Sequence, residues 1–133
     1  MRSAAEKVWR AIPGYQSPNL VYYASEDGEI ASCRIGESTM HILRQRKKLI
    51  SPEYPNGRYR AIFVRVGTQS VEVYIHQLVL RALVGPCPSH HEAEHLDGDG
   101  TNNAVSNLRW SPQRFNRLRM SNRTRKPDWS DQL

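Results

Sequence analysis

The sequence has few cysteines and no long apolar run. Cys33 and Cys87 are its only cysteines among 133 residues, too few for a disulfide framework or a four-cysteine zinc site. No apolar stretch approaches the roughly 20 residues needed to span a bilayer. The N-terminal residues also lack the continuous apolar segment of a secretory signal. These absences predict a reduced, cytoplasmic protein with no membrane partner.

Positive charge, in contrast, is abundant and unevenly placed. Lys and Arg number 19 against 13 Asp and Glu, for a net charge of +6 and a pI near 9.7. Ten of the 19 basic residues fall in two runs, at 44–48 and 114–126. Such clustering favours a polyanionic partner over a merely solvated cationic surface. The candidate residues for contacts with the phosphates of a polyanion such as DNA are Arg44, Arg46, Lys47, Lys48, Arg114, Arg117, Arg119, Arg123, Arg125 and Lys126.

The first half of the chain reads as β-rich. Two β-prone runs flank Asp27-Gly28, a hairpin-turn signal, and predict a hairpin over residues 19–35. A second hairpin is predicted from "RYRAIFVRV" and "SVEVYIH" around "GTQS". Period-2 alternation in the first of these runs places Ile62 and Val64 on one face and Phe63 and Arg65 on the other.

The period then changes from that of a strand to that of a helix. In "HQLVLRALVG" the residues His76, Val79, Leu80 and Leu83 recur at helical spacing, and "GPCP" ends the segment. A helix of about two turns is predicted there. We expect His76 to be a structural histidine, hydrogen-bonded to backbone or to a neighbour, rather than a metal ligand.

The remaining segment predicts a compact ββα unit. "AEHL" and "NLRW" are short strands separated by the turn-rich loop "DGDGTNNAVS". Ser111 suits a helix N-cap and Pro112 the first helical position, so a helix is predicted from Pro112 to Met120. The predicted fold class is α+β, with a β-rich N-terminal module followed by this ββα unit.

A ββα unit brings the end of its first strand beside the first turns of its helix. Glu94 and Asn116 would then offer the hard oxygen ligands that Mg²⁺ prefers. His95 would be free to accept a proton at neutral pH. Consecutive residues of a regular strand point to opposite faces, so Glu94 and His95 can serve one site only if the backbone is irregular there. In a regular strand Asp97, on the same side as His95, becomes the better ligand.

These residues carry a resemblance to a known family. "EHLDGDGTNNAVSNLRW" followed by "SPQRFN" resembles the HNH nuclease motif of phage and intron-encoded homing endonucleases, whose fold is the ββα-metal unit, also called the His-Me finger. The signature positions correspond to His95, Asn107 and Asn116, the last replacing a histidine. "YIHQLVLRALVG" is similar to the helix preceding the motif, and "VWRAIPGY" through "YYASEDGEIASC" is similar to a NUMOD4-like N-terminal module.

The resemblance implies a role for each matched position. His95 corresponds to the general base, Asn116 to a metal ligand, and Asn107 to a residue that ties the loop together through bonds to backbone. Glu94 stands where relatives often carry a metal-binding Asp or His, and His76 lies in the preceding helix. The implied ion is divalent, Mg²⁺ foremost and Mn²⁺ as the alternative.

At the level of the whole protein, the resemblance implies a DNA endonuclease that hydrolyses phosphodiester bonds. Residues 1–70 would form the DNA-contacting module, 71–126 the nuclease domain and 127–133 a tail. The partner would be double-stranded DNA, bound by a monomer or homodimer with no obligate protein partner. The gene would be phage- or mobile-element-encoded and the protein would act in a bacterial host cell. The alternatives are a non-catalytic DNA-binding protein with a degenerate site and an RNA- or structure-specific nuclease.

Overall fold

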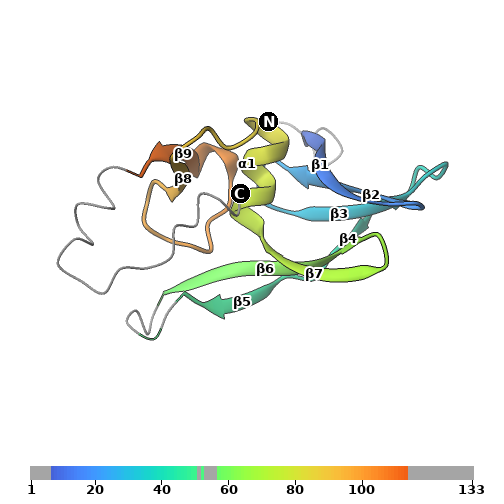
Figure 1. Ribbon diagram of the computed structural model, residues 1–133, viewed down its shortest axis with the longest axis horizontal. Helices are drawn as coiled ribbons and strands as arrows, with labels where there is room; N and C mark the ends of the chain where they lie inside the picture. Colours follow the sequence, from blue (N-terminus) through green and yellow to red (C-terminus); the bar gives the residue numbers. More distant parts are fainter. Residues whose placement is uncertain (1–6, 51, 53–56, 114–133) are drawn as a thin grey trace.

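The computed structural model describes residues 7–50, 52 and 57–113, which form antiparallel sheets around one helix (Figure 1). The first sheet has the order β1-β2-β3-β4, the second β5-β6-β7, and the third is the hairpin β8-β9. The elements are β1 (Trp9–Ser17), β2 (Leu20–Ser25), β3 (Ile30–Arg34), β4 (His41–Ile42), β5 (Arg46–Leu49), β6 (Arg58–Val66), β7 (Gln69–Tyr74), α1 (Ile75–Leu83), β8 (His91–His95), the 3-10 turn η2 (Val105–Asn107) and β9 (Leu108–Pro112).

The predicted hairpin over residues 19–35 is confirmed as β2 and β3. The two strands pair antiparallel, with Ala24 opposite Ile30, and Gly28 takes the left-handed conformation at φ 91°. Strand β1, which the sequence did not predict, pairs with β2 on the outer side. Its register shifts between Ala11 and Gln16, the stretch that contains Pro13 and Gly14. A proline and a glycine inside a strand are typical of such an irregularity.

The second predicted hairpin is confirmed as β6 and β7, which turn at Gly67. Ile62 and Val64 are buried while Phe63 and Arg65 are exposed, as the alternation predicts. The basic run at 44–48 contributes a strand that was not predicted, because Arg46–Leu49 pairs as β5 with β6. Three of the predicted DNA-contacting residues, Arg46, Lys47 and Lys48, therefore lie on a sheet edge and not in a loop.

Helix α1 begins one residue before the predicted helix and packs against both larger sheets. His76, Val79 and Leu80 are buried, and Leu83 packs at the margin of the core. The helix contacts β1, β2 and β6, and Figure 1 shows it between the first sheet and the β8–β9 hairpin. In the part of the chain that is described, no helix has the length and apolar character needed to cross a membrane.

The predicted ββ hairpin is confirmed, but the predicted start of the helix is wrong. Ser111 and Pro112 are strand residues of β9, paired with Glu92 and His91. The N–H of Gln113 also bonds the carbonyl of His90 at 3.0 Å, so pairing continues past the proline. Proline is tolerated there because β9 pairs with β8 alone and is therefore an edge strand. The rest of the predicted helix lies outside the described residues.

Both halves of the chain contribute to one hydrophobic core. Buried side chains from the first sheet, the second sheet, α1 and β9 form a single cluster. Its members are Ile12, Tyr22, Ala24, Ile30, Ile62, Val64, Ile75, Leu78, Val79, Leu80 and Leu108. The division at residue 70 remains a prediction about domains, but packing joins the described residues across that boundary.

Tyr22 offers a test of how the two larger sheets are held together. Its hydroxyl, in a side chain only 3% exposed, accepts a hydrogen bond from the backbone N–H of Arg65 at 2.8 Å. Tyr22→Phe is expected to lower the free energy of unfolding by about 1 to 2 kcal/mol, because that N–H loses its acceptor. Urea denaturation measures the change. Tyr23→Phe, on the opposite face of β2, is the control and should change stability little; equal losses would contradict this role.

Candidate functional site

The β8–β9 hairpin fixes the directions of Glu94 and His95. Pairing is regular along all of β8, with Glu94 opposite Arg109 and His95 opposite Leu108. The two side chains therefore point to opposite faces of the hairpin. The Glu94 carboxylate accepts a hydrogen bond from Arg109 Nε at 2.5 Å, and both side chains are largely exposed. The backbone irregularity that would bring Glu94 and His95 to one face is absent from this strand.

His95 ends β8 and lies in a ring of polar and aromatic side chains. Its Nε2 is 2.8 Å from Oδ1 of Asn103. The ring of Tyr59 stacks on it at 5.8 Å between centroids, and the ring of His76 meets it edge-on at 4.9 Å. Tyr59 comes from β6, His76 from α1 and Asn103 from the loop after β8. Three separate parts of the chain therefore converge on this imidazole.

His76 is buried, and the hydrogen bond expected for it is not formed at Nδ1. The side chain is 5% exposed, and its Nδ1 has no hydrogen-bond partner among the described residues. Burial first, and the neighbouring His95 second, lower the pKa of His76 to about 3. The imidazole is therefore neutral at physiological pH. Its contacts are ring contacts with Tyr59, Tyr74 and His95, so it acts as packing beside His95.

The acidic loop after His95 is tied together internally. Asp97 accepts hydrogen bonds from Asn102 Nδ2 at 2.8 Å, the Asp99 N–H at 2.8 Å and Asn107 Nδ2 at 2.9 Å. These bonds lower the pKa of the Asp97 carboxyl, Asn102 having the largest effect. Asp99 likewise bonds Thr101, which lowers its pKa. The carboxylates at this end of the hairpin are thus held in their charged form.

Asn107 bonds backbone groups on both sides of this loop. Its Oδ1 accepts from the Asp97 N–H at 3.1 Å, and its Nδ2 donates to the carbonyl of Asn102 at 2.9 Å. An asparagine that bonds backbone in both directions closes a loop as a turn would. This geometry is the one that the resemblance implies for Asn107.

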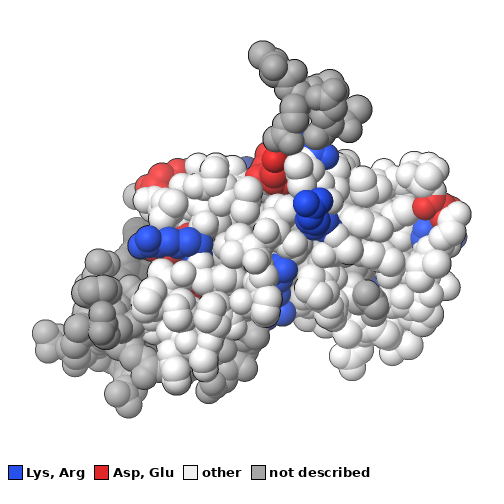
Figure 2. Space-filling view, turned by 90° about the horizontal axis from the view of Figure 1, so that it is seen from above, with Lys and Arg blue, Asp and Glu red and all other residues white. Residues whose placement is uncertain are grey.

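The described members of the predicted DNA-contacting set lie on or beside β5. Arg46 and Lys48 both pair with Glu72 of β7, and the Arg46 guanidinium also lies over the ring of Phe63. Arg44 and Lys47 are exposed and form no ion pair with another described residue. Figure 2 shows no continuous cationic patch on the face that it draws.

Several predicted site residues lie outside the described part of the chain. They are Asn116, Arg114, Arg117, Arg119, Arg123, Arg125 and Lys126. Within the described ranges, no group of three or more His, Cys, Asp or Glu side chains is arranged to hold a metal ion. Glu94 and Asp97 remain the hard-oxygen donors nearest to His95 in the sequence. One or two such carboxylates suffice for Mg²⁺, which usually keeps several waters or binds substrate phosphates as well.

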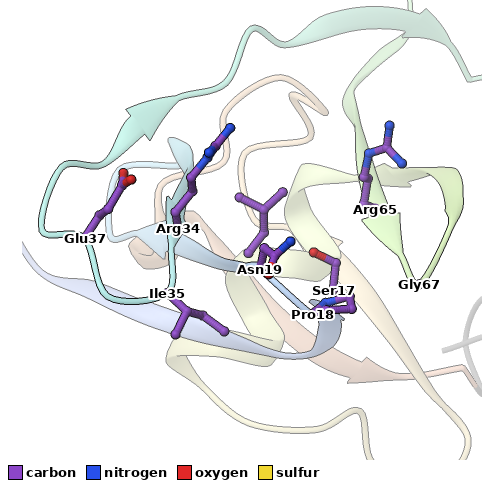
Figure 3. A pocket seen from close by; sticks show the side chains of 9 residues that line it. Ser17, Pro18, Asn19, Arg34, Ile35, Glu37, Arg65 and Gly67 are labelled. Atoms are coloured by element: carbon purple, nitrogen blue, oxygen red, sulfur yellow. The ribbon is translucent and has the colours of Figure 1, made fainter.

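A concave surface away from His95 lies between the turn of β1 and β2 and the turn of β6 and β7 (Figure 3). It is an open hollow of about 560 Å³ in which Arg34 and Arg65 stand beside Asn19 and Gly67. It contains none of the residues around His95, so it is separate from the candidate site.

Sequence reasoning missed two residues that contact His95. Asn103 was predicted only as part of a turn-rich loop, and Tyr59 only as part of the strand run "RYRAIFVRV". The paired asparagines of "TNN", seven and eight residues beyond the histidine, were the available signal for Asn103. For Tyr59 no local signal exists, because its contact with His95 spans separate elements.

A hairpin whose first strand ends on a histidine, with a loop closed by an asparagine, is the arrangement expected for the two strands of a ββα-metal unit. Comparison with known families agrees: residues 73–118 match the HNH endonuclease family model. The expected α+β fold class with a β-rich N-terminal part is confirmed by the solved structure that the chain matches. The β8–β9 hairpin is consistent with a ββα-metal unit, whose predicted helix lies outside the described residues.

The chain is similar in sequence to a phage homing endonuclease. It is 28% identical over 111 residues to DNA endonuclease I-HmuI of Bacillus phage SP01, covering 81% of this chain and 54% of that protein. It also matches a solved structure of the HNH homing endonuclease I-HmuI, which describes DNA binding and cleavage by that enzyme. That match has a TM-score of 0.61 at 25% identity and covers 94% of this chain and 64% of the other. The chain therefore spans about half to two thirds of the length of this relative.

Proposed function

We propose that this protein is a metal-dependent DNA endonuclease of the HNH homing type, with His95 as the general base. The observation that carries the proposal is the placement of His95. It ends a hairpin strand within the segment that matches the HNH model, and its Nε2 is already bonded to Asn103. The other ring nitrogen is then available to take a proton from water.

The proposed metal ligands are Glu94 and Asn116, with Asp97 as the alternative. The Glu94 carboxylate has one cross-strand partner, Arg109, and is 41% exposed. The Asp97 carboxylate instead accepts three hydrogen bonds inside its own loop. Glu94 therefore loses fewer hydrogen bonds when it binds an ion, but the regular strand turns it to the face opposite His95, which favours Asp97. These two observations favour different carboxylates, and experiment must decide between them.

The chemistry divides between the ion and the chain. A divalent ion, Mg²⁺ or Mn²⁺, supplies positive charge for the phosphate and for the leaving oxygen. His95 accepts the proton of the attacking water, and the ring contacts of Tyr59 and His76 limit how far the imidazole can turn. The basic residues of β5 and those from Arg114 to Lys126 bind phosphates and so position the DNA without reading its sequence.

A plasmid assay tests the proposed activity directly. The chain is incubated with a supercoiled plasmid pool carrying random inserts, in Mg²⁺, in Mn²⁺ and in EDTA. Nicked circles are expected with either metal and none in EDTA, because one ββα-metal unit cuts one strand per engagement. Salt-dependent DNA binding without nicking in any metal would replace the proposal with a non-catalytic DNA-binding protein. Cleavage of RNA or branched DNA alone would assign a different substrate.

The choice between the two carboxylate ligands has its own test. Glu94→Gln is expected to raise the Mg²⁺ concentration for half-maximal nicking by about 10- to 100-fold or more, the loss seen even for residues that only support a metal ligand. Arg109→Gln should lower that concentration, since it removes the cation that competes for Glu94. Asp97→Asn serves as the comparison. If it raises the Mg²⁺ requirement and Glu94→Gln does not, the ligand is Asp97.

A further inference from the structure

The hydrogen bond between His95 and Asn103 determines which ring nitrogen carries the proton. Nε2 of His95 lies 2.8 Å from Oδ1 of Asn103, and an amide oxygen can only accept a hydrogen bond. With Oδ1 of Asn103 facing it, Nε2 is the nitrogen that carries the proton in the neutral ring, and Nδ1 keeps its lone pair. Asn103 is 4% exposed, so water does not readily replace it in this bond.

Asn103 is in turn held by the N-terminal half of the chain. The turn between β2 and β3 packs directly on it: a Cβ atom placed on Gly28 would stand 2.9 Å from both the Cβ and the carbonyl oxygen of Asn103. Two residues further on, the N–H of Val105 donates to the carbonyl of Glu26 at 2.8 Å. The side chain of Gln45 fixes the turn from its other side by donating to the carbonyl of Gly28 at 2.8 Å.

This contact requires a glycine in the turn. Gly28 is buried and has φ 91°, a conformation that other residues adopt only with strain. Any larger residue would also push against the backbone of Asn103. The close approach between the first hairpin and the loop of the second half therefore depends on the absence of a side chain at position 28.

We propose that Asn103 is a positioning residue that fixes the tautomer and direction of His95, and that the turn Glu26–Gly28 of the N-terminal module holds Asn103 in place. The inference rests on the proposed function in so far as His95 is the general base. It adds that the N-terminal module contributes to the nuclease site itself, in addition to any DNA contacts that it makes.

The tautomer is tested by ¹⁵N NMR of the histidine side chains at about pH 8.5, where a histidine of ordinary pKa is neutral. Wild type should show His95 protonated at Nε2. Asn103→Leu, which removes the acceptor, should yield a mixture of tautomers, whereas Asn103→Asp, which keeps an acceptor oxygen, should restore the Nε2–H form. An unchanged His95 tautomer in Asn103→Leu, with the fold intact by its backbone spectrum, would overturn the proposal.

Steady-state nicking gives a second readout on the same variants. Asn103→Leu is expected to lower kcat by about tenfold or more, up to the roughly 10²- to 10⁴-fold that a general base contributes, with KM for DNA unchanged. Asn103→Asp should recover most of the loss. A fall in binding with no change in kcat would contradict a positioning role. If wild type fails to nick but the tautomer responds as described, the proposed function fails and the positioning of His95 stands.

The role of the turn is tested by a matched pair of glycine substitutions. Gly28 and Gly36 have φ of 91° and 90°, so Gly28→Ala and Gly36→Ala introduce the same backbone strain. Only position 28 faces a neighbour, because nothing lies within 4 Å of a Cβ at position 36. Gly28→Ala should lower kcat and alter the His95 tautomer, while Gly36→Ala should change neither. Equal values of kcat and the same His95 tautomer in the two variants would show that the N-terminal turn has no role in the site.

Discussion

Replacing His95 by alanine is expected to lower the rate constant for nicking by about 10²- to 10⁴-fold, the contribution typical of a positioned general base. DNA binding should change little, because the proposed phosphate contacts come from other residues. The side chain lies at the end of a regular strand and contacts Asn103, Tyr59 and His76. Single-turnover nicking with enzyme in excess measures the step in which the proton is transferred.

His91→Ala is the matched control for this loss. His91 begins the same strand, and its ring bonds the nearby carbonyl of Ser89 at 2.8 Å. It lies four residues from His95 and outside the ring of side chains described above, so its loss should leave the rate within about threefold. Equal rates for His95→Ala and wild type would exclude His95 as the base. A loss in His91→Ala as large as that in His95→Ala would indicate that the hairpin, and not the imidazole, had been damaged.

The elements that the sequence predicted correctly are those whose signal is local. Asp27-Gly28 and Gly67 identify their turns from the local sequence alone. The spacing of His76, Val79 and Leu80 likewise identifies one buried face of a helix without information from other segments. The strand at Arg46–Leu49 gave no such signal. Its residues are mostly charged, and it is a strand because β6 offers an edge with which it can pair.

The error at Pro112 has the same physical origin. Ser111 followed by Pro112 is a favourable sequence for a helix N-terminus. Both residues nevertheless pair with β8, opposite Glu92 and His91, and this pairing overrides the local preference. Propensity is a weak prior that tertiary context often outweighs. A helix-start signal of two residues is therefore overridden when the segment pairs with another strand. The sequence does not reveal that strand partner.

For the candidate site, the motif indicated His95 and Asn107 but not the residues that support them. Asn103 is close to His95 in sequence, yet its position depends on Gly28, 75 residues earlier. Tyr59 and His76 reach the same imidazole from other elements. Contacts between separate elements follow from packing, and no spacing rule applied to one segment predicts them.

Gly100→Ala is expected to have the largest effect on stability among substitutions in the loop after β8. Gly100 is buried, and a Cβ there would overlap the carbonyl oxygen of Arg58 and stand 2.6 Å from Cδ1 of Tyr59. The Tyr59 ring can turn aside, but the Arg58 carbonyl belongs to strand β6 and cannot. The loop must therefore move as a whole, at a cost of about 3 kcal/mol, the upper end of the usual range for overpacking.

Gly98→Ala separates this overlap from backbone strain. Gly98 has φ 79° with nothing within 4 Å of a Cβ, so alanine there should cost only the strain of a left-handed residue, about 1 to 2 kcal/mol. Urea denaturation compares the two variants. Because Tyr59 also stacks on His95, Gly100→Ala should reduce nicking at temperatures where the protein is still folded, whereas Gly98→Ala should not. Equal stability and equal nicking in the two variants would show that β6 does not hold this loop, and the site would then depend on the β8–β9 hairpin alone.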